Sequence, residues 1–247
     1  MSRKPDYGID SPGIVAGLLI ASALAFAATR FLPRLLHHDV RWLEWIACVY
    51  FLSGALGMLR YSKSGKLRFR DQILASIPWR GNESVLDVGC GRGLLLLAAA
   101  RRLDAGFAIG VDVWNPGAIT GNSSRAVLEN AACEGVAARV RLVAGDARRL
   151  PFRDASFDAV VSNYVIHEVN TADERRQLAS EMARVLKPGG HLAVTDFIFT
   201  RDFVDDLRRA GIESAARVRL GGVFGFWASA ILSFGTTRNY LVTARKR

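Results

Sequence analysis

The chain has 247 residues, of which 50% are hydrophobic, with a formal net charge of +10 and a mean hydropathy of +0.16. This length holds one α/β domain plus a small additional element, and the apolar content is high for a soluble enzyme. The three cysteines (Cys48, Cys90 and Cys133) have no paired spacing, which argues against a disulfide framework and for a reducing compartment. The positive charge suits an anionic surface, either nucleic acid or phospholipid headgroups.

Two apolar segments open the chain. Residues 11–29 carry no charged side chain, and these nineteen residues as a helix cover ~28 Å, close to the hydrocarbon thickness of a bilayer. The second segment, 42–59, has Glu44 as its only charge and begins with Trp42 and Trp45, which are typical of a membrane interface. We therefore expect two transmembrane helices, at about 12–29 and 42–59, within a membrane anchor at 1–61.

Two other interpretations of these segments remain open. The first segment also resembles a signal peptide, with Ala25-Phe-Ala27 as a small-residue cleavage site. Alternatively, both segments are core helices of a soluble cap, since the uncharged part of the second is short for a span. Cations flank the outer ends of the pair, which favours a cytoplasmic location for both flanks, although the linker at 30–41 also carries arginines.

Residues 62–80 mix apolar and charged positions, which predicts an amphipathic helix that ends at Pro78. The basic residues after the second apolar segment are expected to lie on anionic headgroups: Arg60, Lys63, Lys66, Arg68 and Arg70. Gly81-Asn82 then forms a turn that leads into the first strand. We expect this strand and the preceding helix to belong to a second domain, at 62–247.

A glycine-rich loop follows that strand, in the sequence Val85-Leu-Asp-Val-Gly-Cys-Gly-Arg-Gly93. The three glycines allow a tight turn and a close approach of a ligand to the backbone, and the apolar segment 94–103 predicts a helix whose N-terminus faces that ligand. Leu94 occupies the third glycine position of the NAD fingerprint, and no Gly-Lys-Ser/Thr follows, so the loop is neither of these phosphate-binding motifs.

The next two predicted strands each end in an acidic residue. Phe107–Asp112 predicts a second strand that ends in an acid, and the segment from Val140 predicts a third strand that ends in Asp146. Residues 150–167 resemble the fourth strand and exit loop of a known family, and residues 184–196 resemble its helix end, turn and fifth strand.

In this order, the landmarks of residues 65–200 resemble the class I S-adenosylmethionine-dependent methyltransferases. The resemblance implies a Rossmann-like, doubly wound seven-stranded α/β sheet, mostly parallel with one antiparallel strand. It also implies S-adenosylmethionine as the cofactor, with Asp112 on the ribose hydroxyls, Asp146 on the adenine amino group and Trp114 beside the ring. The cofactor-binding residues that it implies are Asp87, Gly89, Cys90, Gly91, Gly93, Asp112, Val113, Trp114, Asp146, Ala147 and Asn163. No metal site is expected, and Cys90 is not expected to be a reactive thiol.

The acceptor is expected beyond the fourth strand, near Asn163, Tyr164 and His167. Ser162-Asn-Tyr-Val165 lacks the prolines of the family's Asn-Pro-Pro-Tyr, which speaks against methylation of adenine or glutamine amides. His167 is the candidate general base, although a histidine here is often structural, and an acceptor without a proton to lose needs no base.

Together, the anchor and the domain predict an integral, two-span membrane protein whose catalytic domain faces the cytoplasm, where S-adenosylmethionine is made. The expected partners are membrane lipids and a lipophilic small-molecule acceptor, such as a quinone precursor, a lipid or a terpenoid. The apolar segment 221–235 is expected either to pack on the sheet or to meet the membrane. The alternatives are an RNA methyltransferase, which a missing RNA-binding module disfavours, and a non-catalytic cofactor-binding scaffold.

Overall fold

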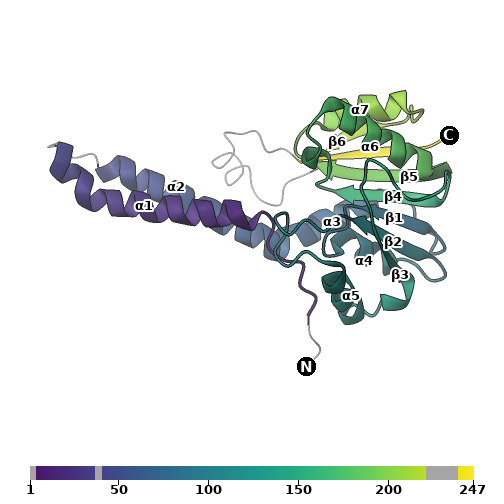
Figure 1. The fold of residues 1–247 in the computed structure, drawn as a ribbon, viewed down its shortest axis with the longest axis horizontal. Coiled ribbons are helices and arrows are strands. Elements are labelled where there is room, and N and C mark those ends of the chain that lie inside the picture. The colour runs from purple at the N-terminus through teal and green to yellow at the C-terminus, as the bar shows by residue number, and fades with distance from the viewer. Residues whose placement is uncertain (1–3, 37–40, 221–238) are drawn as a thin grey trace.

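The computed structural model describes residues 4–36, 41–220 and 239–247, so the expected apolar loop at 221–235 lies outside the described residues. Figure 1 shows two parts: a sheet covered by helices on both faces, and a long helical hairpin that projects from one end of it.

The sheet has the strand order β3-β2-β1-β4-β5-β7-β6. β1 to β5 run parallel, whereas β7 pairs antiparallel with both β5 and β6, so the expected mixed sheet with one antiparallel strand is confirmed. The strands are β1 (Ser84–Val88), β2 (Phe107–Asp112), β3 (Val140–Ala144), β4 (Phe157–Asn163), β5 (Leu186–Asp196), β6 (Ala216–Arg219) and β7 (Tyr240–Arg245).

The central position of β1 explains its apolar sequence. It pairs with β2 on one side and with β4 on the other, and helices cover both of its faces. A strand that is buried on both faces is apolar along almost its whole length, as β1 is, whereas a half-exposed strand alternates apolar and polar residues. Because Val88 is in register with Val111 and with Ser162, the carboxyl ends of these three strands meet at one edge of the sheet.

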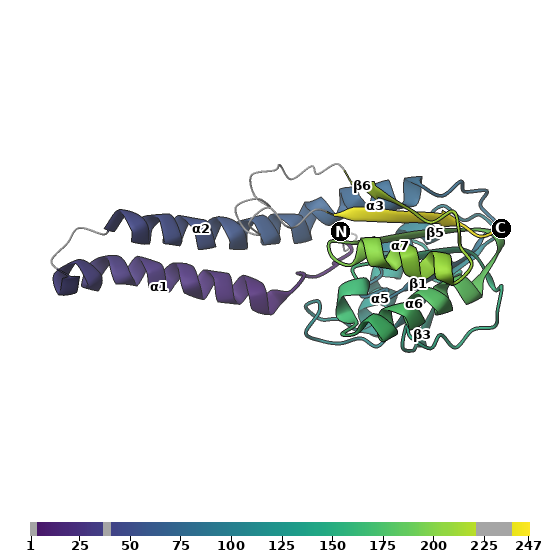
Figure 2. The same cartoon turned by 90° about the horizontal axis from the view of Figure 1, so that it is seen from above.

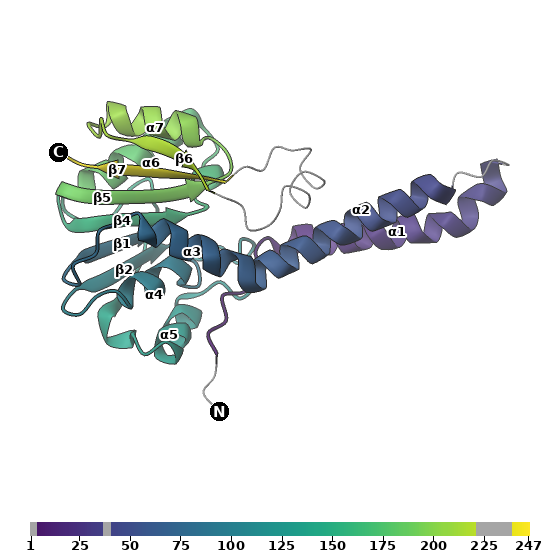
Figure 3. The same cartoon turned by 180° about the vertical axis from the view of Figure 1, so that it is seen from behind.

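The helices of the domain form two layers, each with its own hydrophobic core (Figures 1 and 3). The first layer contains α3 (Lys66–Ala75), α4 (Leu94–Ala100) and α5 (Ser124–Cys133), and the second contains α6 (Ala172–Val185) and α7 (Thr200–Arg209). Two short 3-10 turns, η2 (Ala137–Arg139) and η3 (Ile166–Glu168), complete the domain. A capping box fixes the start of α6, because the Thr171 side chain accepts from the Glu174 N–H while Glu174 binds the Thr171 N–H.

The hairpin consists of α1 (Pro12–Leu36) and α2 (Arg41–Arg60), which lie side by side (Figure 2). α1 is longer than the expected 12–29, because the helix continues through Arg30 and Pro33. At its base, α2 passes through a π-helical turn, η1 (Tyr61–Gly65), directly into α3. The expected boundary between residues 61 and 62 therefore lies inside a continuous helical rod.

The outer surface of the hairpin is apolar and exposed. Within the part of the chain that the structure describes, two helices are long and apolar enough to cross a membrane, and 17% of each apolar window is buried. A core helix of a soluble cap would be mostly buried, which neither of these helices is. The exposed large side chains of the hairpin are Ile14, Leu19, Ile20, Leu24, Phe26, Trp42, Leu43, Trp45, Ile46, Val49, Leu52 and Leu56.

Candidate functional site

The glycine loop joins β1 to α4 at the carboxyl edge of the sheet. Gly89, Gly91 and Gly93 all have positive φ, at +69°, +53° and +87°. The loop is tied to the neighbouring strand, because the Gly89 N–H donates to the Val111 carbonyl at 2.8 Å. Such a turn favours glycine, since other residues adopt the left-handed region at a cost.

The loop is also too close to its neighbours to accept side chains. A Cβ on Gly89 would lie 2.2 Å from Val165 Cγ2, and one on Gly91 would lie 2.9 Å from Ile119 Cδ1. The Cys90 side chain instead packs against Gly110 of β2 and is buried. Burial raises the pKa of the Cys90 thiol, with help from the nearby Asp87, so the thiol stays protonated and has a packing role.

Asp87 lies at the end of β1, fully buried below the loop. Its Oδ2 accepts the Leu96 N–H of the first turn of α4 at 2.8 Å, whereas its Oδ1 is buried with no hydrogen-bond partner among the described residues. Burial raises the pKa of Asp87, against the effect of the Leu96 bond. An unsatisfied buried oxygen is costly, so a cationic ligand group here would offset that cost.

Asp112 ends β2 and holds the glycine loop from the other side. Its Oδ2 accepts the Gly91 N–H at 2.7 Å, and its Oδ1 accepts the Trp114 N–H at 2.6 Å. The Trp114 indole donates back to the Gly91 carbonyl at 3.3 Å, which ties the β2 exit to the loop. Each Asp112 oxygen retains acceptor capacity for a ligand hydroxyl, while the Val113 side chain is exposed.

Asp146 and Ala147 follow β3 at the same edge, where the Gly145 N–H donates to the Asp112 carbonyl at 3.1 Å. The Asp146 carboxylate binds the Arg148 guanidinium at 2.6 Å and the Arg148 N–H at 2.8 Å. These bonds lower the pKa of Asp146. Arg148 also pairs with Glu174 of α6. The contact of Asp146 with adenine stays a prediction.

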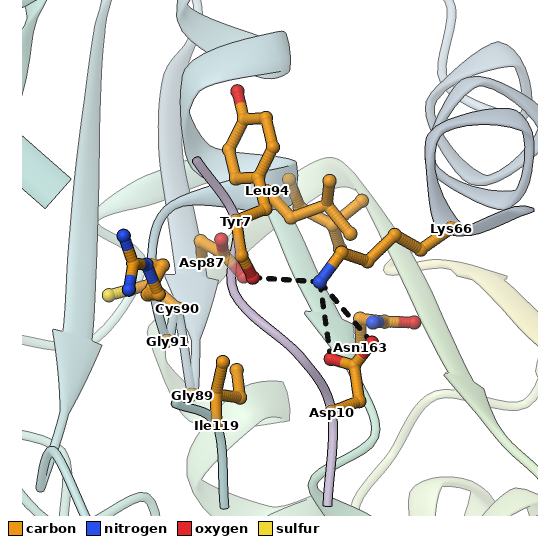
Figure 4. A pocket seen from close by; sticks show the side chains of 12 residues that line it. Tyr7, Asp10, Lys66, Asp87, Gly89, Cys90, Gly91, Leu94, Ile119 and Asn163 are labelled. Carbon is orange, nitrogen blue, oxygen red and sulfur yellow. Dashed lines mark hydrogen bonds and ion pairs between the residues drawn. The ribbon is translucent and has the colours of Figure 1, made fainter. Parts of the chain in front are cut away.

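A small pocket opens above the loop, with a volume of about 40 Å³ (Figure 4). This space holds a few water molecules, whereas cofactor sites are roughly 300 Å³ or larger, so a nucleoside ligand requires the pocket to widen. Five of the expected cofactor-binding residues line this pocket: Asp87, Gly89, Cys90, Gly91 and Asn163. The other six lie outside its lining: Gly93, Asp112, Val113, Trp114, Asp146 and Ala147. Among the other lining residues, Tyr7, Asp10 and Lys66 come from the part of the chain that precedes β1.

Residues 4–11 form an N-terminal strap that crosses the glycine loop before α1 begins. The Asp6 backbone exchanges two hydrogen bonds with the Asn130 side chain, and its carboxylate pairs with Arg92 at 3.0 Å. Further along, the Ile9 N–H donates to Thr120 Oγ1 at 2.8 Å. The strap therefore belongs structurally to the sheet domain, although the sequence grouped it with the anchor.

Lys66 fixes the strap to the start of α3. Its Nζ donates to the Tyr7 and Gly8 carbonyls, at 2.7 and 2.8 Å, and it pairs with Asp10 at 3.2 Å. Burial lowers the pKa of Lys66, while Asp10 opposes this effect. The expectation that Lys66 lies on lipid headgroups was wrong, because the ammonium is buried under the strap.

The acceptor side of the site lies at the ends of β4 and β5. Asn163 Oδ1 accepts from Thr195 Oγ1 at 2.7 Å. Tyr164, the next residue, has a φ of +60°. Its hydroxyl accepts from the Tyr61 hydroxyl at 3.1 Å, so the base of the hairpin contributes to this side. Strained backbone at a non-glycine residue is often found at functional positions.

His167 lies beside this pair and contacts a buried acid that sequence reasoning missed. His167 Nδ1 lies 3.1 Å from Asp196 Oδ2, and Asp196 is fully buried at the end of β5. Burial lowers the pKa of His167, but the bonds and charges of Asp196 and Glu168 outweigh it and raise the pKa above its ordinary value. In the sequence, the only feature that could have indicated this role of Asp196 was its position as an acid at the end of the predicted fifth strand.

The comparisons with known proteins agree with this architecture. Residues 86–194 match the family described as "Methyltransferase domain". Methyltransferase GfsG of Streptomyces halstedii is 33% identical over 59% of this chain and 49% of its own length. The demethylmenaquinone methyltransferase of Lactiplantibacillus plantarum is 34% identical over 50% of this chain and 49% of its own length. The chain thus spans about half the length of these curated relatives.

Among solved structures, a SAM-dependent methyltransferase from Aquifex aeolicus has a TM-score of 0.56 at 18% identity, and covers 76% of this chain and 93% of its own. This likeness shows the fold, which is that of the class I methyltransferases. Together, the fold, the family match and the relatives support an S-adenosylmethionine-dependent methyltransferase domain.

The closeness of Gly89 to Val165 gives a first prediction. Gly89→Ala should weaken S-adenosylmethionine binding by about tenfold or more, because strain of about 1–3 kcal/mol falls on the binding loop. Isothermal titration calorimetry on the full chain measures this. Gly117→Ala is the matched control, since its Cβ would meet only Asn115 Oδ1, at 3.4 Å. Equal affinity of the two variants would contradict the prediction.

Proposed function

We propose that the chain is a membrane-anchored S-adenosylmethionine-dependent methyltransferase that methylates a lipophilic small molecule. The main support for the activity is the glycine loop, which lies between Asp87 and Asp112 at the carboxyl edge of this sheet. The observation that carries the location is the exposed apolar surface of the hairpin.

The described residues fit the proposed cofactor in their donor and acceptor chemistry. The loop glycines leave bare backbone for the nucleoside, and Asp112 offers acceptors to the ribose hydroxyls. Trp114 and Val113 follow Asp112, and Asp146 and Ala147 follow β3, where we place the adenine. Asp87 Oδ1 has no partner among the residues that the structure describes, and it suits a cationic group. The cofactor supplies a methyl group already activated by a sulfonium, so the chain must mainly align the acceptor and exclude water.

His167 is the general base of this proposal, and Asp196 is its positioning residue. Asp196 holds Nδ1, which leaves Nε2 on the other side of the ring, near Glu168 Oε1 at 3.2 Å. A base is required only when the acceptor loses a proton, so this pair favours an acceptor such as a hydroxyl group. Tyr61 and Tyr164 add an aromatic wall beside His167, with the Tyr164 and His167 rings 6.2 Å apart.

Membrane anchoring follows from the free energy of exposing the hairpin to water. Burial of apolar surface stabilises by about 25 cal/mol per Å², and twelve large apolar side chains are exposed among the hairpin residues whose burial the structure describes. A bilayer would cover this surface, and the enzyme would then meet molecules that partition into it. The names of relatives that act on demethylmenaquinone and on a sterol support an acceptor of this kind.

The His167–Asp196 pair predicts a pH dependence. Only neutral His167 can accept a proton, so kcat should fall as the pH drops through a pKa above that of free histidine, about 6.5. Asp196→Asn removes a charge that raises this pKa, so the midpoint should move to lower pH and kcat should fall about tenfold or more. Glu168→Gln is the control and should shift the midpoint less. An unchanged midpoint in Asp196→Asn would refute the pairing.

The anchor predicts that the full chain resists extraction from membranes by alkaline carbonate and dissolves only in detergent. An Asp substitution at both Leu24 and Val49, on exposed outer positions of the two helices, should release a measurable soluble fraction, since a charge is costly in a bilayer. Asp substitutions at exposed positions of the domain should have no such effect. Complete release of the unaltered chain by carbonate would contradict membrane insertion.

The activity itself is tested with the full chain in detergent and methyl-labelled S-adenosylmethionine. We expect label in the lipid extract of a deletion strain, and little in the extract of the unaltered strain, whose acceptor is already methylated. Total RNA from the deletion strain is a parallel substrate. Label in RNA alone would favour an RNA methyltransferase, and label in neither, despite cofactor binding, would favour a non-catalytic scaffold.

A further inference from the structure

A buried cation lies in the wall of the cofactor pocket, outside the residues that match the methyltransferase family. Lys66 begins α3, is 3% exposed, and shares the pocket with Asp87 and Asn163 (Figure 4). A buried ammonium requires partners for its donors. Two of these partners are neutral carbonyls of the strap, and the third is the Asp10 carboxylate.

Asp10 is the weakest of the three partners in its geometry. It lies 3.2 Å from Lys66 Nζ, whereas the Tyr7 and Gly8 carbonyls lie at 2.7 and 2.8 Å. Its side chain is 32% exposed, and Ser62 Oγ also donates to it at 3.0 Å. Asp10 therefore has another donor and access to water, so it can leave Lys66 without becoming a buried, unpaired charge.

The pocket thus presents one acid and one base to a ligand. Asp87 Oδ1 is buried without a partner among the described residues, and Lys66 supplies a cation whose carboxylate partner is replaceable. An acid and a base in one small pocket match the two charges of an α-amino acid, whose ammonium and carboxylate share a single carbon atom. The methionine end of S-adenosylmethionine is such a group.

We propose that Lys66 binds the carboxylate of the cofactor, and that Asp10 occupies the place of this carboxylate while the pocket is closed. This inference rests on the proposed function. One carboxylate then replaces another, so Lys66 remains paired in both states and no charge is left bare in the pocket. The Asp10 side chain moves away from Lys66 as the pocket widens from its present volume of about 40 Å³, whereas the Tyr7 and Gly8 carbonyls remain on the ammonium.

The test compares two ligands that differ by the carboxylate alone: S-adenosylmethionine and its decarboxylated form. Calorimetry on the full chain in detergent gives both dissociation constants, and their ratio measures the preference for the carboxylate. We expect the unaltered chain to prefer S-adenosylmethionine by about tenfold or more, because charge-assisted hydrogen bonds to a carboxylate are strong.

Lys66→Met should remove this preference and bring the ratio close to one, whereas Lys66→Arg should retain most of it. Lys63→Met is the matched control, since Lys63 lies in the adjacent π turn and is exposed, and it should leave the ratio unchanged. Thermal melting without ligand identifies any variant that fails to fold. A Lys66→Met chain that folds and keeps the full preference would overturn the proposal.

Asp10→Asn keeps Lys66 intact and removes the competing carboxylate. We expect the ratio to rise about threefold or more, because Lys66 is then available to the cofactor at lower cost. A ratio that stays constant or falls would overturn the role of Asp10. If the unaltered chain binds neither ligand, the proposed function fails; if it binds both equally well, the function stands and the Lys66 inference fails.

Discussion

The site depends on one steric constraint, the turn between β1 and α4 that has no room for side chains. Because Gly89 and Gly91 lie against Val165 and Ile119, the loop brings its backbone N–H groups to the carboxyl edge of the sheet. There the Gly91 N–H reaches Asp112, which couples the loop to the next strand. The parallel strands on both sides end at the same level, so the end of β4 places Asn163 in the pocket beside that loop, and the end of β5 places Asp196 one strand further along the same edge.

The sequence was sufficient for much of the sheet domain. The strand Phe107–Asp112 was predicted with its observed bounds, because it is an apolar segment bounded by turn residues. The third strand was predicted to end at Asp146, whereas β3 ends two residues earlier, at Ala144. Glycine-rich turns occur in many folds, so the glycine loop was assigned to S-adenosylmethionine only together with the acids Asp112 and Asp146 further along the chain. The change of composition near residue 62 was read as a boundary, but the helix does not break there, since α2 runs through a π turn into α3.

The contacts that the sequence did not reveal join residues far apart in the chain. Asp6 binds Asn130, and Lys66 binds Asp10, across spans in which local periodicity carries no information about pairing. Lys66 was one cation among several in a basic segment, and only the fold shows that the strap buries it. Asp196 was visible as an acid after a strand, but its pairing with His167 needs the parallel register of β4 and β5.

These contacts connect the hairpin with the site, because the strap leads into α1 and Tyr61 at the base of α2 meets Tyr164. The most direct test of this arrangement is an experimental structure of the full chain with S-adenosylmethionine. We expect the ribose at Asp112, the methionine end between Asp87 and Lys66, and the Asp10 carboxylate displaced from Lys66. A cofactor bound away from the glycine loop, or a closed pocket at saturating cofactor, would contradict the proposed site.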